Sequence, residues 1–478
     1  MEKRGEIELI RESNKTILEK SKLPRPVRKY LLKKEDAEIQ KLKHNALKIS
    51  IKEGSALSVS GLGSTYITPF ALALNAKSIH IGILSSLSGL LSPLAQFFGS
   101  RLMEKNSRKN IVMKFVLAEA LMWLPIALLA FLFWQNILPG YAPFILIGLY
   151  SLLVIFSGFS YPAWFSWMGD LVPEDERGKY FCTRNKTTGI VGLVATLIGA
   201  YLLKVFESKG YVLIGFAVLF ILSFGFRMTS FRYLHKQYEP RFKLKKGSYF
   251  SIWSFLKRMD NYGKFAVYQT FFNFALMIAS PFFSVYMLKS LGFNYVTYII
   301  VSLSSSVFYL LFLPLAGKFS DKYGNVKLFF IANILFVIGP ILWLFIKSPV
   351  LLIALPQVTS GMANAALVIS VTNFTYSAVS QQHRGICVAY TNIIIGIGVF
   401  FGSLLGGLLI SYINFSFITP FFFVFIVSAL LRLAVALIFM PKIQEVKPVK
   451  HIPPMHIKLA HPFKTLHAEI GWVKHFLK

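Results

Sequence analysis

The chain alternates between long apolar stretches and short polar breaks. About twelve of the stretches approach the ~20 residues that a helix needs to cross the hydrocarbon core of a bilayer. We expect these spans at residues 54–74, 78–99, 111–134, 141–168, 181–204, 211–229, 264–288, 295–316, 328–347, 350–376, 386–411 and 417–440. The pattern therefore predicts an all-α membrane protein with twelve transmembrane helices.

Basic residues mark every second break between these spans. The even-numbered breaks hold Arg101, Lys105, Arg108 and Lys109, then Arg177 and Lys179, the basic residues of the long break 230–263, Lys318, Lys322 and Lys327, and finally Arg384. The odd-numbered breaks hold only scattered lysines and no arginine. Because cytoplasmic loops are enriched in lysine and arginine, this asymmetry places both termini in the cytoplasm.

Composition and charge agree with a membrane protein. Of the 478 residues, 55% are hydrophobic and only 15% are charged, while the formal net charge is +30. A charge of this size is typical of proteins that bind nucleic acid or an anionic membrane surface. Here the basic residues are dispersed over many short loops, so we expect contacts with anionic lipids and no nucleic-acid partner.

Short strings recur at spacings of 205 to 218 residues, which indicates an internal repeat. The pairs are Thr68-Pro69-Phe70 with Ser280-Pro281-Phe282, Ser86-Leu87-Ser88 with Ser302-Leu303-Ser304, Gly99 with Gly317, Arg177-Gly178 with Arg384-Gly385, and Ser223 and Arg227 with Ser428 and Arg432. Two six-helix bundles in parallel repeat, related by an axis along the membrane normal, place a cavity between them at mid-membrane. We therefore expect bundles at 54–229 and 264–440, a cytoplasmic central loop at 230–263, a basic amphipathic region at 1–53 and a basic tail at 441–478.

The break at 317–327 reads GKFSDKYGNVK and resembles the loop signature of the major facilitator superfamily. The matching residues are Gly317, Asp321, Lys322, Gly324 and Lys327. We expect Gly317 to allow close helix approach and Gly324 to turn the chain with a positive φ. The first-half copy has Met103 where the signature has aspartate, with Glu104 one place on.

A second motif, DLVPEDERGKYFCTRN from Asp170 to Asn185, resembles a prokaryotic subgroup of the same superfamily. The resemblance covers roughly residues 54–440. It implies alternating access, with cytoplasmic loops that form a charge latch between the bundles. The latch candidates in these loops are Asp170, Arg177, Gly178, Arg184, Arg384 and Gly385. We expect Asp321 to meet Arg177 or Arg184, and Glu104 to meet Arg384; alternatively, these residues only set topology and solvate loops.

Charged residues are rare inside the predicted spans, where they are costly and usually functional. Glu119 is the one acid clearly at membrane depth, and Glu53 lies at the mouth of the first span. Both are candidates for proton coupling. Alternatively, Glu119 pairs with Lys114, Arg184 or Lys186. Arg227 and Arg432 lie a few turns from the cytoplasmic ends of their spans, so we interpret them as structural residues that snorkel toward the interface.

The resemblance implies that spans 1, 4, 7 and 10 line the solute path. Polar and aromatic residues in these spans are the cavity candidates, namely Tyr66, Thr68, Tyr161, Trp164, Tyr268, Gln269, Asn273, Gln357, Asn364 and Asn373. An amide deep in a span needs a partner, which is either a neighbouring helix or the solute. The scarcity of fixed charge favours a neutral or amphipathic solute. Gly396, Gly398, Gly402 and Gly406 predict close helix packing.

These patterns favour a secondary active transporter that moves a small organic solute and is coupled to a proton or another cation. We expect a multi-pass, monomeric protein of the cell membrane that is not an enzyme and uses no cofactor or metal. One alternative is an exporter of hydrophobic, drug-like compounds. Another is a membrane-embedded enzyme or a receptor without transport, although no nucleophile, base and metal ligands converge at one depth.

Overall fold

A computed structural model describes residues 25–137, 139–172, 177–240, 252–257, 260–379, 384–413 and 418–446. The regular structure within these residues is entirely helical. The predictions for residues 1–24, for 241–251 of the central loop and for the tail beyond 446 lie outside the described residues.

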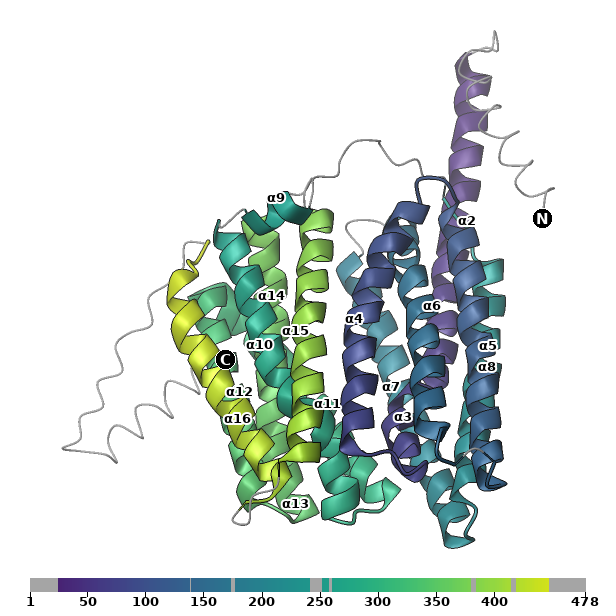
Figure 1. Ribbon diagram of the computed structural model, residues 1–478. Coiled ribbons are helices and arrows are strands. Elements are labelled where there is room, and N and C mark those ends of the chain that lie inside the picture. Colours follow the sequence, from purple (N-terminus) through teal and green to yellow (C-terminus); the bar gives the residue numbers. More distant parts are fainter. Residues whose placement is uncertain are drawn as a thin grey trace.

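The first half of the chain forms seven helices, which lie together on the right of Figure 1. They are α2 (Arg25–Ser60), α3 (Leu62–Ala73), α4 (Ser78–Leu102), α5 (Arg108–Trp134), α6 (Ala142–Leu171), α7 (Arg177–Ser208) and α8 (Val212–Lys236).

The second half lies beside the first (Figure 1). It comprises α9 (Ile252–Lys257), α10 (Asn261–Val285) with its π-helical continuation η1 (Tyr286–Ser290), α11 (Tyr295–Tyr323), α12 (Asn325–Phe345), α13 (Pro349–Leu352), the π-helical η2 (Ile353–Gln357), α14 (Val358–Ala378), α15 (Arg384–Tyr412), α16 (Pro420–Phe439) and the 3₁₀ turn η3 (Met440–Lys442).

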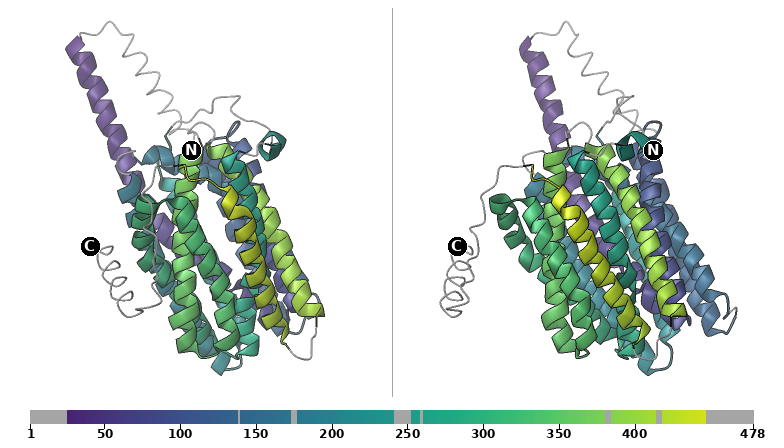
Figure 2. Two further views of the ribbon diagram at one scale, coloured as in Figure 1. Left: turned by 90° about the vertical axis from the view of Figure 1, so that its left-hand side faces the viewer. Right: turned by 60° about the vertical axis from the view of Figure 1, so that its left-hand side comes forward.

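Eleven helical segments in the described part of the chain are long and apolar enough to cross a membrane. They correspond to the second through twelfth predicted spans. The first predicted span is divided between α2 and α3 at Gly61. The helix that contains residue 54 begins well before the predicted span, because α2 runs without a break from Arg25 and projects beyond the bundle (Figure 2). Pro26 does not interrupt α2, since a helix tolerates proline in its first turn.

In both halves a corresponding serine bonds the main chain of a corresponding residue on the first span of that half, which agrees with the internal repeat. In the first half the Ser223 hydroxyl accepts a hydrogen bond from the Gly63 N–H at 2.9 Å. In the second half the Ser428 hydroxyl donates to the Ala275 carbonyl at 2.6 Å. Gly63 and Ala275 are 212 residues apart, the same spacing as between Thr68 and Ser280.

Each half also ends on a glutamate that caps a helix of the same half. The Glu239 carboxylate accepts from the Lys109 N–H in the first turn of α5 at 3.1 Å. The Glu445 carboxylate accepts from the Val326 N–H in the first turn of α12 at 2.8 Å. A carboxylate at a helix N-terminus satisfies an unpaired donor and interacts favourably with the helix dipole. Glu239 and Glu445 were not among the repeated strings, because the residues around them differ between the halves and a single shared residue does not form a string.

The halves meet through glycine-lined contacts of α15. A Cβ atom on Gly82 of α4 would lie 3.0 Å from the Gly407 Cα, and the Ser85 and Ser403 hydroxyls are 3.2 Å apart. On its other side α15 packs on α10, because a Cβ on Gly402 would lie 2.3 Å from the Phe274 carbonyl oxygen. Gly396, Gly398 and Gly406 make similarly close approaches, so the predicted helix packing is confirmed.

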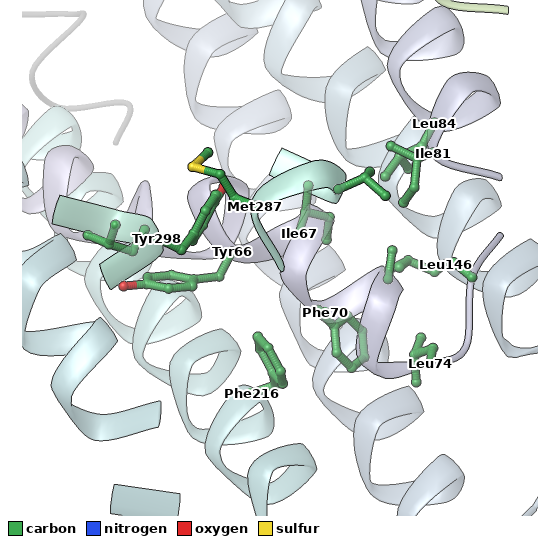
Figure 3. Packing of buried hydrophobic residues seen from close by; sticks show 14 of the residues in the cluster. Tyr66, Ile67, Phe70, Leu74, Ile81, Leu84, Leu146, Phe216, Met287 and Tyr298 are labelled. Atoms are coloured by element: carbon green, nitrogen blue, oxygen red, sulfur yellow. The ribbon is translucent and has the colours of Figure 1, made fainter. Parts of the chain in front are cut away.

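One apolar core joins both halves at the end of the bundle where α3 ends and α8 and α11 begin (Figure 3). We call this end the closed face. Phe216 meets Tyr295 there with ring centroids 5.6 Å apart, and the Lys289 ammonium donates to the Ala76 carbonyl at 3.0 Å. The opposite end, which carries the basic breaks, is the basic face. Toward it, one core surrounds Trp167 in the first half and another surrounds Phe265 in the second, with Leu94 and Phe97 of α4 packed against the latter.

Candidate functional site

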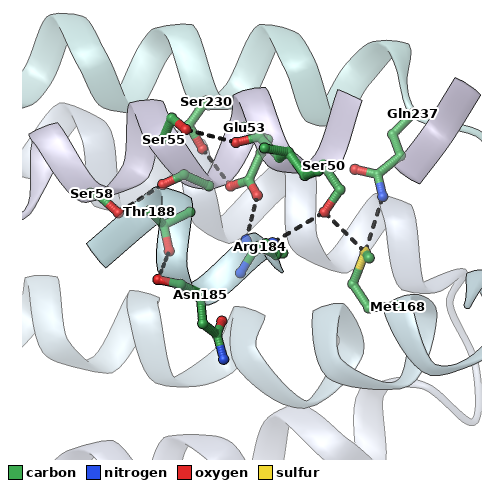
Figure 4. A network of polar contacts seen from close by, with 12 residues as sticks. Ser50, Glu53, Ser55, Ser58, Met168, Arg184, Asn185, Thr188, Ser230 and Gln237 are labelled. Atoms are coloured by element: carbon green, nitrogen blue, oxygen red, sulfur yellow. Dashed lines mark hydrogen bonds and ion pairs between the residues drawn. The ribbon is translucent and has the colours of Figure 1, made fainter. Parts of the chain in front are cut away.

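A chain of buried charges runs through the first half. Glu53 of α2 is 1% exposed, and its Oε2 lies 3.1 Å from Nη2 of Arg184 on α7. Its other oxygen, Oε1, accepts a hydrogen bond from the Ser230 hydroxyl of α8 at 2.9 Å. Figure 4 shows Arg184 and Ser230 converging on this carboxylate. Both oxygens of Glu53 are therefore engaged, one by a cation and one by a neutral donor.

The chain continues from Ser230 to a second ion pair. The Ser230 hydroxyl accepts from Arg227 Nη1 at 3.1 Å, and Arg227 Nη2 lies 2.6 Å from Glu119 Oε2 on α5. The four charged residues sum to zero, which makes their burial tolerable, since buried charges need partners with good geometry. The network thus holds α2, α5, α7 and α8 together.

Arg184 has further partners within the same half. Its Nε donates to the Ser50 hydroxyl at 3.3 Å, and its guanidinium carbon lies 4.8 Å from the ring centroid of Trp164. The latch prediction placed Arg184 against Asp321 of the other half. The structure instead holds it against α2 and α6, because Glu53 supplies the carboxylate from within the bundle.

For several latch residues the structure describes the helix in which they lie but not the side chain. Arg177 and Gly178 lie at the start of α7, Arg384 and Gly385 at the start of α15, and Asp321 near the end of α11. Their side chains lie outside the described residues. The proposed contacts of Asp321 and Arg384 therefore stay predictions. Glu104 is exposed at the basic face.

The predicted partners of Glu119 were wrong. Lys114 and Lys186 are exposed, and Arg184 is paired with Glu53. Arg227 and Arg432 also do not snorkel, since they are only 4% and 2% exposed. A snorkelling arginine needs a route to water along an apolar surface, whereas both of these side chains turn inward to polar groups of neighbouring helices.

The second half lacks a counterpart for most of this network. Arg432, the counterpart of Arg227, donates to the carbonyls of Phe336 and Leu276 at 2.6 and 3.2 Å. The spacing between Lys109 and Val326 makes Phe336 the counterpart of Glu119. The spacing between Gly63 and Ala275 makes Phe265 the counterpart of Glu53. Arg184 corresponds to Thr391 at the spacing of the Arg-Gly strings. Both buried carboxylates of the described chain thus belong to the first half.

Asp170 belongs to a clamp at the basic face. Its Oδ2 lies 2.6 Å from Nη1 of the buried Arg108 at the start of α5. Arg108 Nη2 also donates to the Pro240 carbonyl at 2.8 Å, and the Trp167 indole donates to the Tyr238 carbonyl at the same distance. The segment that leaves α8 is therefore fixed across the ends of α5 and α6, all within one half.

The signature loop agrees with one glycine prediction and contradicts the other. Gly324 has a φ of 101°, which confirms the predicted turn. Among the described residues, none has an atom within 4 Å of a Cβ built on Gly317, so the close approach predicted there is not found. Its repeat counterpart Gly99 does allow such an approach, since its Cβ would lie 2.6 Å from the Phe159 carbonyl oxygen. The Lys322 ammonium lies 5.2 Å from the Tyr323 ring centroid, and Lys327 is half-buried.

The first-half cavity candidates occupy different environments. Tyr66 is fully buried and donates to the Thr196 carbonyl of α7 at 2.6 Å, so its hydroxyl is used within the core. Thr68 is half-buried. Tyr161 is half exposed and stacks on Trp164, whose ring also contacts Arg184.

The second-half candidates are mostly amides with nearby partners. Asn364 Nδ2 donates to the Ser360 carbonyl at 2.8 Å, and Asn373 Nδ2 donates to the Ser320 hydroxyl at 2.9 Å. Tyr268 accepts from Asn333 of α12, and Gln357 is buried at the end of η2.

Gln269 and Asn273 lie one turn apart on α10. Asn273 Nδ2 donates to the Gln269 carbonyl at 2.8 Å. The amides of Asn273 and Asn364 thus bond back to their own helices, whereas Tyr66 and Tyr268 are held in the cores.

Sequence reasoning missed Ser230, Ser50 and Asn333. Each of them completes a buried polar contact. The sequence around a serine or asparagine in a span does not indicate which residue it will contact. The pairing of Arg227 with Glu119 had one available signal, because two opposite charges in separate spans of one half stabilise each other when they are buried.

Solved structures share this fold. The bacterial homologue of the human lysosomal transporter Spinster, in an inward-facing and unoccupied conformation, matches with a TM-score of 0.63 at 13% identity, covering 84% of this chain and 96% of that one. The nucleoside transporter NupG matches with a TM-score of 0.60 at 17% identity, covering 84% of this chain and 98% of that one.

Curated relatives match over short segments. An uncharacterized transporter of Schizosaccharomyces pombe is 30% identical over 98 residues, which are 20% of this chain and 17% of the relative. The vacuolar basic amino acid transporter 2 of Saccharomyces cerevisiae is 30% identical over 103 residues, or 22% of each chain. The matches therefore span about a fifth of each of these two relatives.

The family comparison covers most of the chain. The Major Facilitator Superfamily model matches residues 54–305 and again residues 265–473. These two matches overlap in α10 and α11. The first begins one residue after Glu53 and includes its network partners Glu119, Arg184, Arg227 and Ser230, and the second includes the amides of the second half. With the two repeated six-helix halves described above, they establish that this chain belongs to the Major Facilitator Superfamily.

Proposed function

We propose that this protein is a secondary active transporter that moves a small neutral or amphipathic organic solute by alternating access, driven by a proton. The basic face is the cytoplasmic side, and the cell membrane is the site of action. The halves share the buried residues of one apolar core at the closed face, whereas toward the basic face each half has a core of its own buried residues, and Leu94 and Phe97 of α4 pack against that of the second half.

The asymmetry of the buried charges carries this proposal. Contacts that the fold itself requires recur in both halves, as Ser223 and Ser428 illustrate. The carboxylates of Glu53 and Glu119 do not recur, since their counterparts are phenylalanines. A buried ion pair adds little to stability compared with well-packed apolar residues. The first-half charges are therefore better explained by a function than by folding.

Glu53 is the proposed site of the coupling proton. A proton on its carboxylate would neutralise the group that Arg184 binds at 3.1 Å and leave the cation on α7 without its anion. Because α7 also contacts α11 of the other half, movement of α7 relative to α2 would reach the interface between the bundles. Glu119 is the second carboxylate of the buried charge network and keeps Arg227 in place.

Among the described residues, every buried arginine and every buried carboxylate already has a partner within the protein, which leaves the solute no unpaired buried charge to bind. In the described part of the chain the buried arginines are bonded to carboxylates or carbonyls, and both buried carboxylates are paired. The groups that remain for a solute are amides, hydroxyls and aromatic rings. The nucleoside transporter among the structural neighbours makes a nucleoside a sensible first probe.

Transport by purified protein in liposomes tests the proposal. The probes are uridine, glucose, leucine, lysine and a cationic dye, each measured with and without an imposed pH gradient. Wild type should accumulate at least one uncharged probe against its gradient. Glu53→Gln should lose that accumulation but keep solute exchange, because exchange needs no net proton movement. The matched control Glu207→Gln changes an exposed glutamate near the end of α7 and should behave as wild type.

Two results would contradict the proposal. Absence of flux for every probe would count against a carrier. Uphill accumulation that persists in Glu53→Gln and in Glu119→Gln would count against a coupling role for the charge network.

A further inference from the structure

The N-terminus of α4 lies where the two halves meet at the closed face. A Cβ atom on Gly407 of α15 would lie 3.3 Å from the Ser78 carbonyl oxygen in the first turn of α4. Two residues earlier, the carbonyl of the fully buried Ala76 accepts a hydrogen bond from the Lys289 ammonium of η1 at 3.0 Å. The turn that begins α4 therefore contacts two elements of the second half.

A histidine side chain caps this turn. The Lys77 N–H donates to Nδ1 of His80 at 3.0 Å, and the His80 N–H donates to the Lys77 carbonyl at the same distance. At the third position of a helix, this side-chain acceptor is usually a glutamate or a glutamine. An imidazole nitrogen accepts a hydrogen bond only when it carries no proton. The cap therefore exists only while Nδ1 of His80 is unprotonated.

Two cations face the His80 ring. They are the ammonium of Lys77 on its own turn and that of Lys289 on η1. The partial positive charge of a helix N-terminus adds to the effect of these lysines. His80 is only half-buried, so a proton can reach the ring from the water.

The other elements packed on this turn bring no charge to it. From α6 the ring of Phe144 packs on His80 with centroids 4.8 Å apart, and the exposed Tyr141 at the start of α6 stays neutral below about pH 10. Beyond Arg384 at its far end, α15 has no charged residue. A proton on His80 would therefore have two like charges beside it and no anion from these elements.

The internal repeat shows that the fold does not require a histidine at this position. The spacing of the repeated serine strings makes Val296, in the first turn of α11, the counterpart of His80. Asn294 caps α11 instead, since its Oδ1 accepts from the Thr297 N–H at 2.8 Å. An asparagine side chain does not titrate, so pH does not change the cap of α11. The titratable cap is thus specific to the first half.

We propose that His80 is a second proton-binding site of this protein, and that its protonation decides whether the closed face stays closed. Neutral His80 caps α4 and holds Ala76 and Ser78 against the second half. Protonated His80 releases the cap and favours separation of the halves at this face. The proposal rests on the proposed movement of the two halves, and it goes beyond the coupling role of Glu53.

Two effects of the added proton act in the same direction. The proton that water delivers to Nδ1 turns an acceptor into a donor, so the Lys77 N–H loses its partner. The new positive charge also repels the Lys289 ammonium, which weakens its bond to the Ala76 carbonyl. Histidine changes its charge between about pH 5 and 8, so the closed face would respond to the pH on its own side of the membrane.

Hydrogen–deuterium exchange of the purified protein tests the proposal without any transport. The segments to follow are 72–82 and 286–296, which contain the cap and the Lys289 bridge. Exchange is corrected for the intrinsic effect of pH. Wild type should then exchange about threefold or more faster in both segments at about pH 5 than at about pH 8, as expected for an opening equilibrium that loses one hydrogen bond.

Three variants assign the response to His80. His80→Gln keeps an acceptor for the Lys77 N–H and takes up no proton, so its corrected exchange should be equally slow at both pH values. His80→Ala removes the cap and should exchange faster than wild type at about pH 8. The matched control His235→Gln changes an exposed histidine in the last turn of α8 and should respond to pH as wild type does.

Lys289→Met tests the link to the second half. The Ala76 carbonyl loses its donor from η1, so segment 72–82 should exchange faster than in wild type at about pH 8. Equal protection of this segment in Lys289→Met and wild type would overturn the link between the cap and the second half.

Two results would overturn the proton site itself. One is a pH response in His80→Gln equal to that of wild type. The other is no pH response of wild type in either segment, which is the result that a purely structural cap predicts.

Failure of the proposed function is distinguishable from failure of this inference. If wild type moved no solute in liposomes, a pH response of the closed face that His80→Gln abolishes would still support a proton site at His80. Where transport is measured, His80→Gln should keep uphill accumulation, whereas Glu53→Gln should lose it. Loss of accumulation in His80→Gln at about pH 8, where His80 is neutral, would count against two separate proton sites.

Discussion

Glu119 and Arg227 illustrate how a single buried residue depends on its partner. Their side chains are almost fully buried, and Arg227 Nη2 lies 2.6 Å from Glu119 Oε2. Removal of one member of a buried pair leaves an uncompensated charge in an apolar environment, whereas replacement of both by apolar residues is often tolerated.

Glu119→Leu should therefore destabilise the protein strongly, by about 3–5 kcal/mol, as for other broken buried pairs. The double variant Glu119→Leu with Arg227→Met should recover much of that loss. Thermal unfolding in detergent measures both. A double variant as unstable as the single one would mean that the ion pair is not the source of the effect.

Glu239 gives a pH-dependent contribution at the basic face. Burial raises the pKa of this carboxyl above its ordinary value of 4.5, and the Lys109 N–H and the Arg108 and Lys109 cations oppose the rise. A raised pKa in the folded state means that the folded protein binds the proton more tightly than the unfolded chain. The stability from this group is thus present at acidic pH and is lost as pH rises through the folded pKa.

We expect the melting temperature of Glu239→Gln to vary less between about pH 4 and 7 than that of wild type, because the variant has no proton to lose there. The difference between the two melting curves should grow in favour of the variant as pH rises. Parallel curves for the two proteins would contradict this expectation.

Among the elements, the spans could be predicted closely and their irregularities could not. Eleven spans follow from apolar runs of sufficient length, because burial in a bilayer demands such runs directly. The break at Gly61 and the π-helical η1 and η2 were not predicted, although η2 contains Pro356, which lacks the N–H of a regular helical hydrogen bond. The repeated strings correctly indicated two halves, because Ser223 and Ser428 bond to the main chain at the corresponding residues Gly63 and Ala275.

The α10–α15 contact gives a prediction at this scale. A Cβ on Gly402 would lie 2.3 Å from the Phe274 carbonyl oxygen, which belongs to a rigid backbone. Gly402→Ala should therefore force the two helices apart and destabilise the protein by about 1–3 kcal/mol. The matched control Gly148→Ala in α6, where a Cβ meets nothing within 4 Å, should be neutral or slightly stabilising. Equal melting temperatures for the two variants would contradict the packing.

For the whole molecule, the contact between α4 and α15 decides whether the halves can separate at the closed face. The Ser85 and Ser403 hydroxyl oxygens lie 3.2 Å apart, one in each half. Cysteines at such positions are close enough to form a disulfide.

Ser85→Cys combined with Ser403→Cys should form an inter-half disulfide on oxidation and stop transport. Reduction should restore transport, because the bond blocks separation without removing any proposed binding group. Mass spectrometry checks the bond, and each single cysteine variant is the control. Full transport by the cross-linked protein would show that the halves need not separate here.

The candidate site was predictable in its residues but not in its pairings. Glu53, Glu119 and Arg184 stand out in the sequence because charge in a span is rare. Their partners depend on which faces of α2, α5, α7 and α8 turn inward, and the first turn of α7 was expected to reach across to the other half. The helix α2 brings Glu53 to Arg184 first, so that side chain is already used within its own bundle.

The unbroken helix α2 connects a point outside the bundle with Glu53. From Arg25 to Glu53 the helix rises by about 40 Å at 1.5 Å per residue. Because α2 is one continuous helix, a change in the tilt of its projecting end also moves the end that packs in the bundle. A domain fused before Arg25, or an antibody fragment bound to the projecting turns, would thus apply torque to the carboxylate that holds Arg184. A mechanical load on one end of the protein would in this way reach the ion pair between Glu53 and Arg184 buried inside it.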